Sequence, residues 1–494
     1  MLRTSLPGIL LVATLVVAGA AEGNAAHAEP LADVIDTAIS ARLQQAGVPP
    51  AGPLDDERFL RRLMLDLAGR VPTLAEREAF LSGSSPDKRA VWVDRLLESP
   101  DFALHLRNEL DLLLLARLTA DNDWRAYLLE ATRANRGWGD LFREIMLPER
   151  LREGEKGPAA FLRERVRDLD DLTNDTAVLF FGVNIGCAKC HDHPLVPDWE
   201  QQHYYGMASF FQRTYRTKQG LLAERFDGRL KFKTVVGDEL EAEFMFLDGA
   251  ATYEPPVELS DKRRKELEEQ VRKAQREDGA EPPRPEFSPR AELVRMALDP
   301  AEADYFSRNM VNRTWARLLG QGFVEPLDQM HTENPPSHPE LLDALARDFA
   351  AHGHDLKRLI RGIVLSDTYA RDSRLSGNAE LPAADLFAVA LPRPLTPRQL
   401  AASLQVATAL PERMQGVVGG DAWESEREAI EKRSDSFAKQ IEIPGENFQV
   451  SVDEALLFTN SERIASDYLR DAGDRLVRHL RSLEENQAVA SVAI

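Results

Sequence analysis

Signals for the start of an α-helix recur along this chain. A capping box, in which a side-chain acceptor stands three residues before Glu or Gln, begins at each of Thr73, Ser337, Thr396 and Ser451. Ser85 followed by Pro86 adds another start, because proline is favoured at the first helical position. Apolar residues recur at helical spacing, as in Phe59, Leu63 and Leu67. The sequence therefore predicts a mainly α-helical protein.

One stretch alternates apolar and polar residues instead. The alternation runs from Arg229 to Val235 and again from Leu240 to Phe246, on either side of Gly237 and Asp238. Alternation with period two around such a pair is typical of a β-hairpin. We therefore expect one β-hairpin within the helical protein.

The length of 494 residues is too great for one hydrophobic core and suits two or three domains. We expect a signal peptide at 1–28, a helical domain at 29–216, an insertion at 217–289 and a second helical domain at 290–494. The insertion would hold the hairpin and a Pro-rich linker. Between them, the run from Ser260 to Asp278 is dense in Lys, Arg and Glu, which is typical of a solvated helix.

The N-terminus has the pattern of a secretory signal peptide. Arg3 precedes an apolar run from Ile9 to Ala21, and small residues end at an A-x-A cleavage pattern at 26–28. No later stretch reaches the roughly 20 apolar residues of a membrane helix, so we expect no transmembrane segment after cleavage. No cysteine near the cut could carry a lipid anchor. The mature protein should be exported and soluble, in the periplasm or outside the cell.

The two cysteines of the chain stand three positions apart and are followed at once by histidine, in GCAKCHDHP at 186–194. CxxCH is the spelling used for covalent haem attachment. On one helical turn, Cys187, Cys190 and His191 would share a face and could meet one flat macrocycle. The thiols would become thioethers and His191 would be the proximal iron ligand of a haem c.

Other chemistry is open to the same segment. In an exported protein the two cysteines could form a local disulfide, although so small a loop stabilises little. A redox-active CxxC pair is a further alternative. Zinc held by Cys187 and Cys190 with one or two of His191, His193 and His203 would satisfy a tetrahedral preference.

A sixth iron ligand would decide what a bound haem does. A Met or His there makes an electron carrier, whereas an open position permits chemistry on small molecules. Met207 and His203 are the candidates nearby in sequence. His193 would need a sharp chain reversal to reach the opposite haem face. In the second domain, further candidates that could close the site across an interface are Met330, His331 and His338.

The formal net charge of −20 argues against nucleic acid and anionic membranes as partners. A basic protein or a cationic substrate is favoured, although solubility alone would explain the charge. Asp55, Asp56 and Asp66 offer carboxylates, but the first two precede a helix, where acidic residues favour the dipole. The loop at 334–339 is either a rigid connector or part of a ligand cleft. The motifs of zinc proteases, serine hydrolases, P-loop enzymes and dinucleotide-binding folds are not found.

Ordered motifs of the first helical domain resemble the planctomycete cytochrome-type (PSCyt-like) domain, which is catalogued as a domain of unknown function. They are DDERFLRR at 55–62, LDLAGRVPT at 65–73, SPDKR at 85–89, DRLLESP at 94–100 and FGVNIGCAKCHDHP at 181–194. The second domain resembles the companion (PSD-like) domain that usually follows it. Its motifs are NRTW at 312–315, GQG at 320–322, PLD at 326–328, NPPSHPELL at 334–342 and DLKRLI at 355–360.

The resemblance implies an exported protein of a family whose activity is unknown and whose name comes from the cytochrome-like motif. Many relatives carry a separate N-terminal cytochrome domain, and here we expect the single CxxCH to serve alone. Relatives are frequently associated with sulfatases and polysaccharide-degrading systems. The resemblance therefore implies a setting in complex-carbohydrate metabolism, with glycan-processing proteins among the partners.

The sequence thus predicts a c-type-cytochrome-like protein that binds one haem through Cys187, Cys190 and His191 and acts in electron transfer or a haem-linked redox step with an unidentified redox partner. The alternative is a non-catalytic binding or structural protein in which zinc or a disulfide stabilises a CxxCHxH knuckle. Whether the protein is an enzyme stays open.

Overall fold

The structure is a computed structural model that describes residues 30–118, 121–148, 157–256, 259–299, 304–375, 380–420, 423–444 and 451–483. About 55% of the protein is helical, and the described strands form only two-stranded sheets. The mainly α-helical fold expected from the sequence is confirmed. The predicted signal peptide at 1–28 lies outside the described residues.

The N-terminal unit is built from helices. They are α1 (Leu31–Ala46), α2 (Asp56–Ala68), α3 (Leu74–Leu81), α4 (Lys88–Leu97), α5 (Pro100–Leu115), α6 (Asn122–Arg133), α7 (Trp138–Met146), α8 (Ala160–Arg165), α9 (Leu169–Phe181) and α10 (Gln201–Ser209). The predicted capping box at Thr73 is present, since its hydroxyl accepts from Glu76 N while the Glu76 carboxylate accepts from Thr73 N. Asp55 caps α2 by accepting from Arg58 N, which confirms its expected role at a helix start.

Three short hairpins follow α10. They pair β1 (Thr214–Arg216) with β2 (Leu222–Glu224), β3 (Lys231–Lys233) with β4 (Glu239–Glu241), and β5 (Phe244–Met245) with β6 (Ala251–Thr252), all antiparallel. The predicted hairpin is β3 and β4, which turn at Gly237 with φ 95°. Its second strand ends at Glu241, because Phe244 pairs with Thr252 instead. The charged run expected to be a solvated helix forms α11 (Asp261–Arg276).

The C-terminal unit is also helical. Its helices are α12 (Pro289–Ala297), α13 (Tyr305–Leu319), α14 (Pro339–Ala351), α15 (Leu356–Val364), α16 (Pro397–Ala407), α17 (Trp423–Ala438), α18 (Val452–Asn460) and α19 (Leu476–Arg481). The predicted capping box at Thr396 is present and opens α16. As predicted from Ser451, α18 begins at the next residue.

Two predicted helix starts are wrong. Ser85 does not cap α4, because its hydroxyl accepts from Asp87 N at 3.3 Å and closes a turn, so the helix begins later, at Lys88. Ser337 does not cap α14 either. Its hydroxyl lies 3.1 Å from Nδ1 of His338, and His338 occupies the cap position without a side-chain cap bond.

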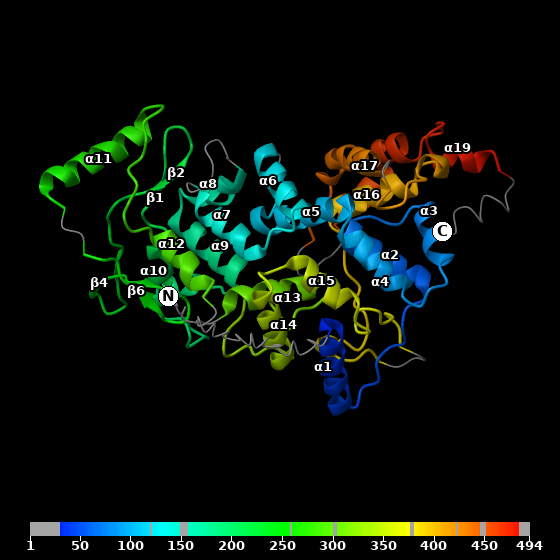
Figure 1. Cartoon of the computed structure of the whole chain (residues 1–494), viewed down its shortest axis with the longest axis horizontal. Helices are drawn as coiled ribbons and strands as arrows, with labels where there is room; N and C mark the ends of the chain where they lie inside the picture. Colours follow the sequence, from blue (N-terminus) through cyan, green and yellow to red (C-terminus); the bar gives the residue numbers. More distant parts are fainter. Residues whose placement is uncertain are drawn as a thin grey trace, which may run out of the picture.

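The largest hydrophobic cluster in the described part of the chain draws on both helical units. Trp138 of α7 stacks between Phe180 of α9 and Phe306 of α13, with ring centroids 5.4 and 6.1 Å apart. In addition, α9 packs on α13, and α1 packs on α14 and α15. Figure 1 shows this central packing, with α11 and the hairpins at one end of the molecule and α16 to α19 at the other. The site described below lies where the two units meet.

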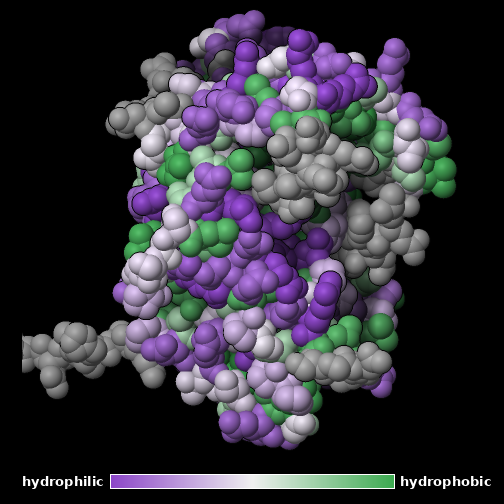
Figure 2. Space-filling view, turned by 90° about the vertical axis from the view of Figure 1, so that its right-hand side faces the viewer, coloured by the Kyte–Doolittle hydropathy of each residue, from purple (hydrophilic) through white to green (hydrophobic). Residues whose placement is uncertain are grey.

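The face of the molecule drawn in Figure 2 is predominantly polar. Figure 2 shows the end of the molecule that carries α2 to α4 and α16 to α19, where hydrophilic residues cover most of the view and hydrophobic ones are scattered. No helix in the part of the chain that the structure describes combines the length and the apolar character needed to cross a membrane.

Candidate functional site

The CxxCH segment lies between α9 and α10. Helix α9 ends at Gly182, whose φ of 70° reverses the chain. A side chain is excluded there, because an added Cβ would lie 2.8 Å from Oδ1 of Asn309. The chain then forms a short 3₁₀ helix, Gly186–Lys189, that carries Cys187 and delivers Cys190 and His191 directly after its end.

Both cysteines are free thiols on the surface, and His191 beside them is exposed as well. Nδ1 of His191 lies 2.7 Å from the carbonyl oxygen of Asp192. A carbonyl can only accept, so Nδ1 is the donor in this contact, and in a neutral imidazole Nε2 would then hold the lone pair that a metal binds. Two exposed thiols and an exposed imidazole thus lie within five consecutive residues. The donor set therefore fits covalent haem.

A network of polar contacts with α9 and α10 holds the CxxCH segment in place. Lys189 forms an ion pair with Asp170 at the start of α9, and the Tyr204 hydroxyl donates to the same carboxylate. These bonds lower the pKa of Asp170, and the hydrogen bond that Lys189 donates to Asp170 raises the pKa of Lys189. Gln201 donates its backbone N–H to Asp192 at 3.0 Å and its amide to Lys189 O at 3.3 Å. The backbone around Cys190 is therefore held on two sides.

Exposed apolar side chains fringe the segment. Gln201 also accepts from Val235 N at 3.3 Å, which holds the tip of the β3–β4 hairpin beside α10. At that tip Val235 and Val236 are 68% and 80% exposed, and Leu195 on the segment itself is 80% exposed. These exposed aliphatic side chains, which lie on or beside the segment that carries the two thiols, could cover an apolar ligand.

The C-terminal unit contributes a strand-like piece of chain to the site. Asn184 N donates to Asp328 O at 2.9 Å, and Met330 N donates to Gly182 O at 3.0 Å. Val183 and Gln329 form an isolated antiparallel bridge between these bonds. The backbone leading into the CxxCH segment is therefore paired with the other unit.

His331 follows directly after this pairing. Its neighbour Thr332 donates its backbone N–H to Asp198 at 2.9 Å, and the Thr332 hydroxyl donates to the same carboxylate. Burial, His331 and His191 together lower the pKa of His193, so these histidines interact electrostatically. Nδ1 of His331 is buried without a hydrogen-bond partner in the described structure. A polar atom in that position is available for a ligand.

The other predicted ligands are placed differently. Met207 and Met330 are buried in the core, whereas the thiols are exposed. His203 is partly buried, which lowers its pKa, and its Nδ1 accepts from Glu200 N at 3.1 Å. His338 is 5% exposed and packs against the ring of Phe387.

No group of three or more His, Cys, Asp or Glu side chains in the described ranges is placed to hold a metal ion.

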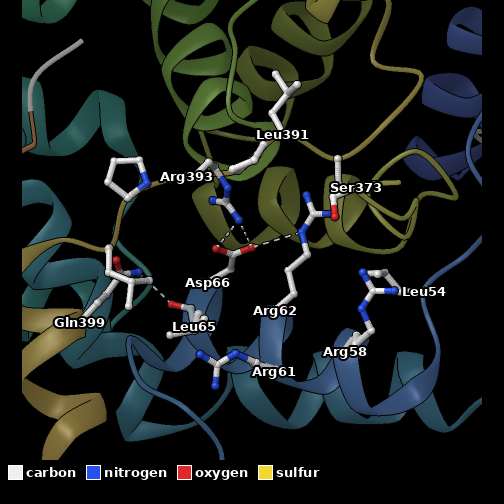
Figure 3. Close-up of a pocket in the computed structure, with 14 residues that line it drawn as sticks. Leu54, Arg58, Arg61, Arg62, Leu65, Asp66, Ser373, Leu391, Arg393 and Gln399 are labelled. Atoms are coloured by element: carbon white, nitrogen blue, oxygen red, sulfur yellow. Dashed lines mark hydrogen bonds and ion pairs between the residues drawn. The ribbon is translucent and has the colours of Figure 1, made fainter. Parts of the chain in front are cut away.

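Sequence reasoning missed a cavity of about 390 Å³ between α2 and the segment before α16 (Figure 3). Its walls include Arg58, Arg61, Arg62 and Asp66 of α2, together with Arg393. The sequence signal was the spacing of the α2 residues, since positions three, four and eight residues apart share a helix face. Arg393 carried no such signal, because it lies 327 positions from Asp66.

Comparisons with known proteins give two matches that cover most of the chain. Residues 34–216 match a family model described as a protein of unknown function, DUF1549 or PSCyt2. Residues 289–473 match a second one with the same description, DUF1553 or PSD1. The search of curated proteins returned no match, and neither did the search of solved structures.

Proposed function

Since this chain belongs to the family that joins a DUF1549 domain to a DUF1553 domain, both without an assigned activity, we propose its function from the site itself. The protein carries one haem c, attached through Cys187 and Cys190, and acts in electron transfer or a haem-linked redox step. When bound, the haem supplies an iron centre that changes its charge by one electron.

The donor set at the segment supports this proposal most directly. Both thiols are exposed and free, so neither is held in a disulfide or buried away from a vinyl group. His191 donates from Nδ1 to Asp192 O, and in the neutral imidazole this leaves Nε2 free, which is the state a proximal iron ligand needs. Leu195, Val235 and Val236 would shield the apolar faces of the macrocycle.

The second unit supplies the candidate for a further iron ligand. His331 interacts with His193, and its Nδ1 has no partner in the described structure. The bonds from Met330 N and Thr332 hold the backbone on both sides of it. Its position beside the CxxCH loop would make the C-terminal unit part of the haem site.

Export belongs to the same proposal. Covalent haem is attached outside the bacterial cytoplasm, and the sequence pattern at 1–28 predicts export to the periplasm or beyond. A protein with a net charge of −20 would attract a basic redox partner, because complementary charge accelerates encounter.

The test is production of the full chain, with its own leader, in a host that has cytochrome c maturation machinery. We expect a Soret band that stays with the polypeptide after denaturation and an in-gel haem stain at the size of the protein. Both should disappear in Cys187→Ala and Cys190→Ala. His352→Ala serves as a matched control, since this exposed histidine lies on the other unit.

Two outcomes would overturn the proposal. A colourless protein that contains one zinc per chain, lost in Cys187→Ala, would establish the structural knuckle instead. A colourless protein with neither haem nor zinc would leave the thiols without a cofactor.

A further inference from the structure

The cavity between α2 and the segment before α16 is built by both units. One wall is the face of α2 that carries Arg58, Arg62 and Asp66, and the opposite wall is the segment from Ala390 to Leu395. Figure 3 shows the guanidinium groups of Arg62 and Arg393 converging on the carboxylate of Asp66 from these two walls. A volume of about 390 Å³ is within the range of small-molecule sites.

The cavity carries an excess of positive charge. Its lining contains four arginines and one carboxylate, that of Asp66. Arg58 is neutralised by an ion pair with Asp372. Partly buried Glu109 interacts with both Arg317 and Arg393, and the charge of Arg317, which is outside the lining, offsets that of Glu109. Two positive charges therefore remain without a matching carboxylate in a protein whose overall charge is −20.

Arg62 and Arg393 share a single carboxylate of the lining, that of Asp66. Arg393 takes both oxygens of Asp66, at 2.9 and 2.8 Å, whereas Arg62 reaches that carboxylate only at 3.9 Å. The other partners of Arg62 are uncharged: it donates to the backbone carbonyls of Tyr369 and Leu318, and its guanidinium lies 4.0 Å from the centroid of the Tyr369 ring. Its side chain is 11% exposed, and this burial lowers its pKa. A bound anion would offset the free-energy cost of burying the charged guanidinium of Arg62.

Arg61 is the accessible cation of the lining. It is exposed and has no hydrogen bond, ion pair or ring contact with the described residues. A guanidinium offers a planar pair of donors that matches the oxygens of a carboxylate, a sulfate or a phosphate. Arg61 is therefore free to engage a ligand without breaking an existing bond.

The rest of the lining is mainly apolar. Its apolar residues are Leu54, Leu65, Ala390, Leu391, Pro392, Pro394 and Leu395, and the only uncharged polar residues of the lining are Ser373 and Gln399. An inorganic ion would leave these surfaces wet, whereas a compact hydrocarbon group would bury them. The lining thus combines a cationic side with an apolar side.

We propose that this cavity binds a small organic anion, in which a carboxylate, sulfate or phosphate group is attached to a compact apolar body. The oxyanion lies among the arginines of α2, and the apolar body lies against the segment that contains Leu391 and Pro392. The site is separate from the CxxCH segment and does not depend on a haem.

The test is calorimetric titration of the full chain with benzoate, phenyl sulfate and phenyl phosphate. Benzyl alcohol serves as the uncharged analogue and inorganic sulfate as the anion without an apolar body. We expect at least one aromatic anion to bind at least tenfold more tightly than either of these two controls. The three arms distinguish a carboxylate from a sulfate or phosphate ligand.

Variants locate the site. Arg61→Gln should weaken binding about tenfold or more, because a charge-assisted bond is lost. Leu391→Glu, which places a negative charge in the half-buried wall, should abolish it. Arg276→Gln is the matched control, since that exposed arginine ends α11 at the other end of the molecule. It should bind like the wild type.

The proposal fails if no aromatic anion binds at millimolar concentration, or if Arg61→Gln binds as tightly as Arg276→Gln. It also fails if inorganic sulfate binds as tightly as phenyl sulfate, because the apolar wall would then contribute nothing. Haem content is to be measured in each variant, and it should equal that of the wild type. This separates a failure of the anion site from a failure of the haem proposal.

Discussion

Arg393 donates to both carboxylate oxygens of Asp66, at 2.9 and 2.8 Å, although the two residues are 327 positions apart in the chain. The Tyr369 hydroxyl donates to the same carboxylate at 2.8 Å. Burial opposes the ionisation of Asp66, but the charges of Arg393 and Arg62 overcome it, so the pKa of Asp66 lies below its usual value. One buried carboxylate thus ties α2 to the C-terminal unit.

Replacing Asp66 with Asn should therefore destabilise the fold. The amide removes the carboxylate that Arg62 and Arg393 share, and breaking a buried ion pair in this way costs about 3 kcal/mol. Urea denaturation at pH 7 measures the difference. Asp278→Asn, on an exposed residue, is the control and should stay within about 0.5 kcal/mol of the wild type. An equal effect of the two variants would contradict the prediction.

A second buried carboxylate is predicted to matter as much. Four guanidinium groups surround Glu431, those of Arg107, Arg125, Arg398 and Arg427. Burial raises the pKa of Glu431, but these charges outweigh it and hold the pKa at about 2. Glu431→Gln should cost roughly 3 kcal/mol of unfolding free energy, because the four arginines lose the carboxylate they share and keep only Asp101, Asp111 and Asp435 as countercharges. Chemical denaturation beside the exposed control Glu277→Gln measures it; a loss below that of the control would refute it.

Stability should depend on pH through His338. Burial first, and then the nearby charge of Arg42, lower its pKa to about 4. Below pH about 6.5, His338 is protonated in the unfolded chain but stays neutral in the folded protein. The free energy of unfolding therefore falls as the pH drops from about 6.5 to 4. At about 1.4 kcal/mol for each pKa unit, the loss over this window is about 3 kcal/mol.

The check is the free energy of unfolding measured from pH 7 to pH 4. His338→Phe keeps a ring against Phe323 and Phe387. In this variant the slope of the unfolding free energy against pH should decrease by the contribution of about one proton. His352→Gln, at an exposed position, should keep the slope. The assignment is wrong if His338→Phe and the wild type show the same pH dependence.

Gly206 of α10 should not tolerate a methyl group. An added Cβ would lie 2.6 Å from Cβ of Met245 and 3.0 Å from its carbonyl oxygen, so α10 would have to move away from β5. Overpacking of this kind costs about 2 kcal/mol. Thermal unfolding of Gly206→Ala measures it. Gly52→Ala is the control, because nothing lies within 4 Å of a Cβ there. Similar melting temperatures for the two variants would disprove the close contact.

Local features were predictable from the sequence. The capping boxes at Thr73 and Thr396 and the turn at Gly237 form because each needs only residues within a few positions. Ser85, followed by Pro, and Ser337, in a capping-box pattern, also carry local signals for a helix start, but their hydroxyls bond elsewhere, to Asp87 N and to His338. Which partner a hydroxyl takes depends on the path of the chain around it, and the pattern does not encode that path.

Contacts between residues that are far apart in the sequence could not be predicted from it. The sequence names the CxxCH segment, because its spacing is local, and it offered His331 only as one of several distant candidates. The pairing of Asn184 with Asp328 that brings His331 there leaves no trace in composition or periodicity. Asp66 is a similar case, since nothing in its local sequence points to Arg393.

The packing of α1 on α14 and α15, and of α9 on α13, has a consequence for dissection of the gene. A protein cut in the Pro-rich linker near Gly279 would behave as a split protein, whose halves need each other to cover Trp138, Phe180 and Phe306. We expect either half alone to aggregate, and the two co-expressed halves to reassemble into a particle that melts in one step.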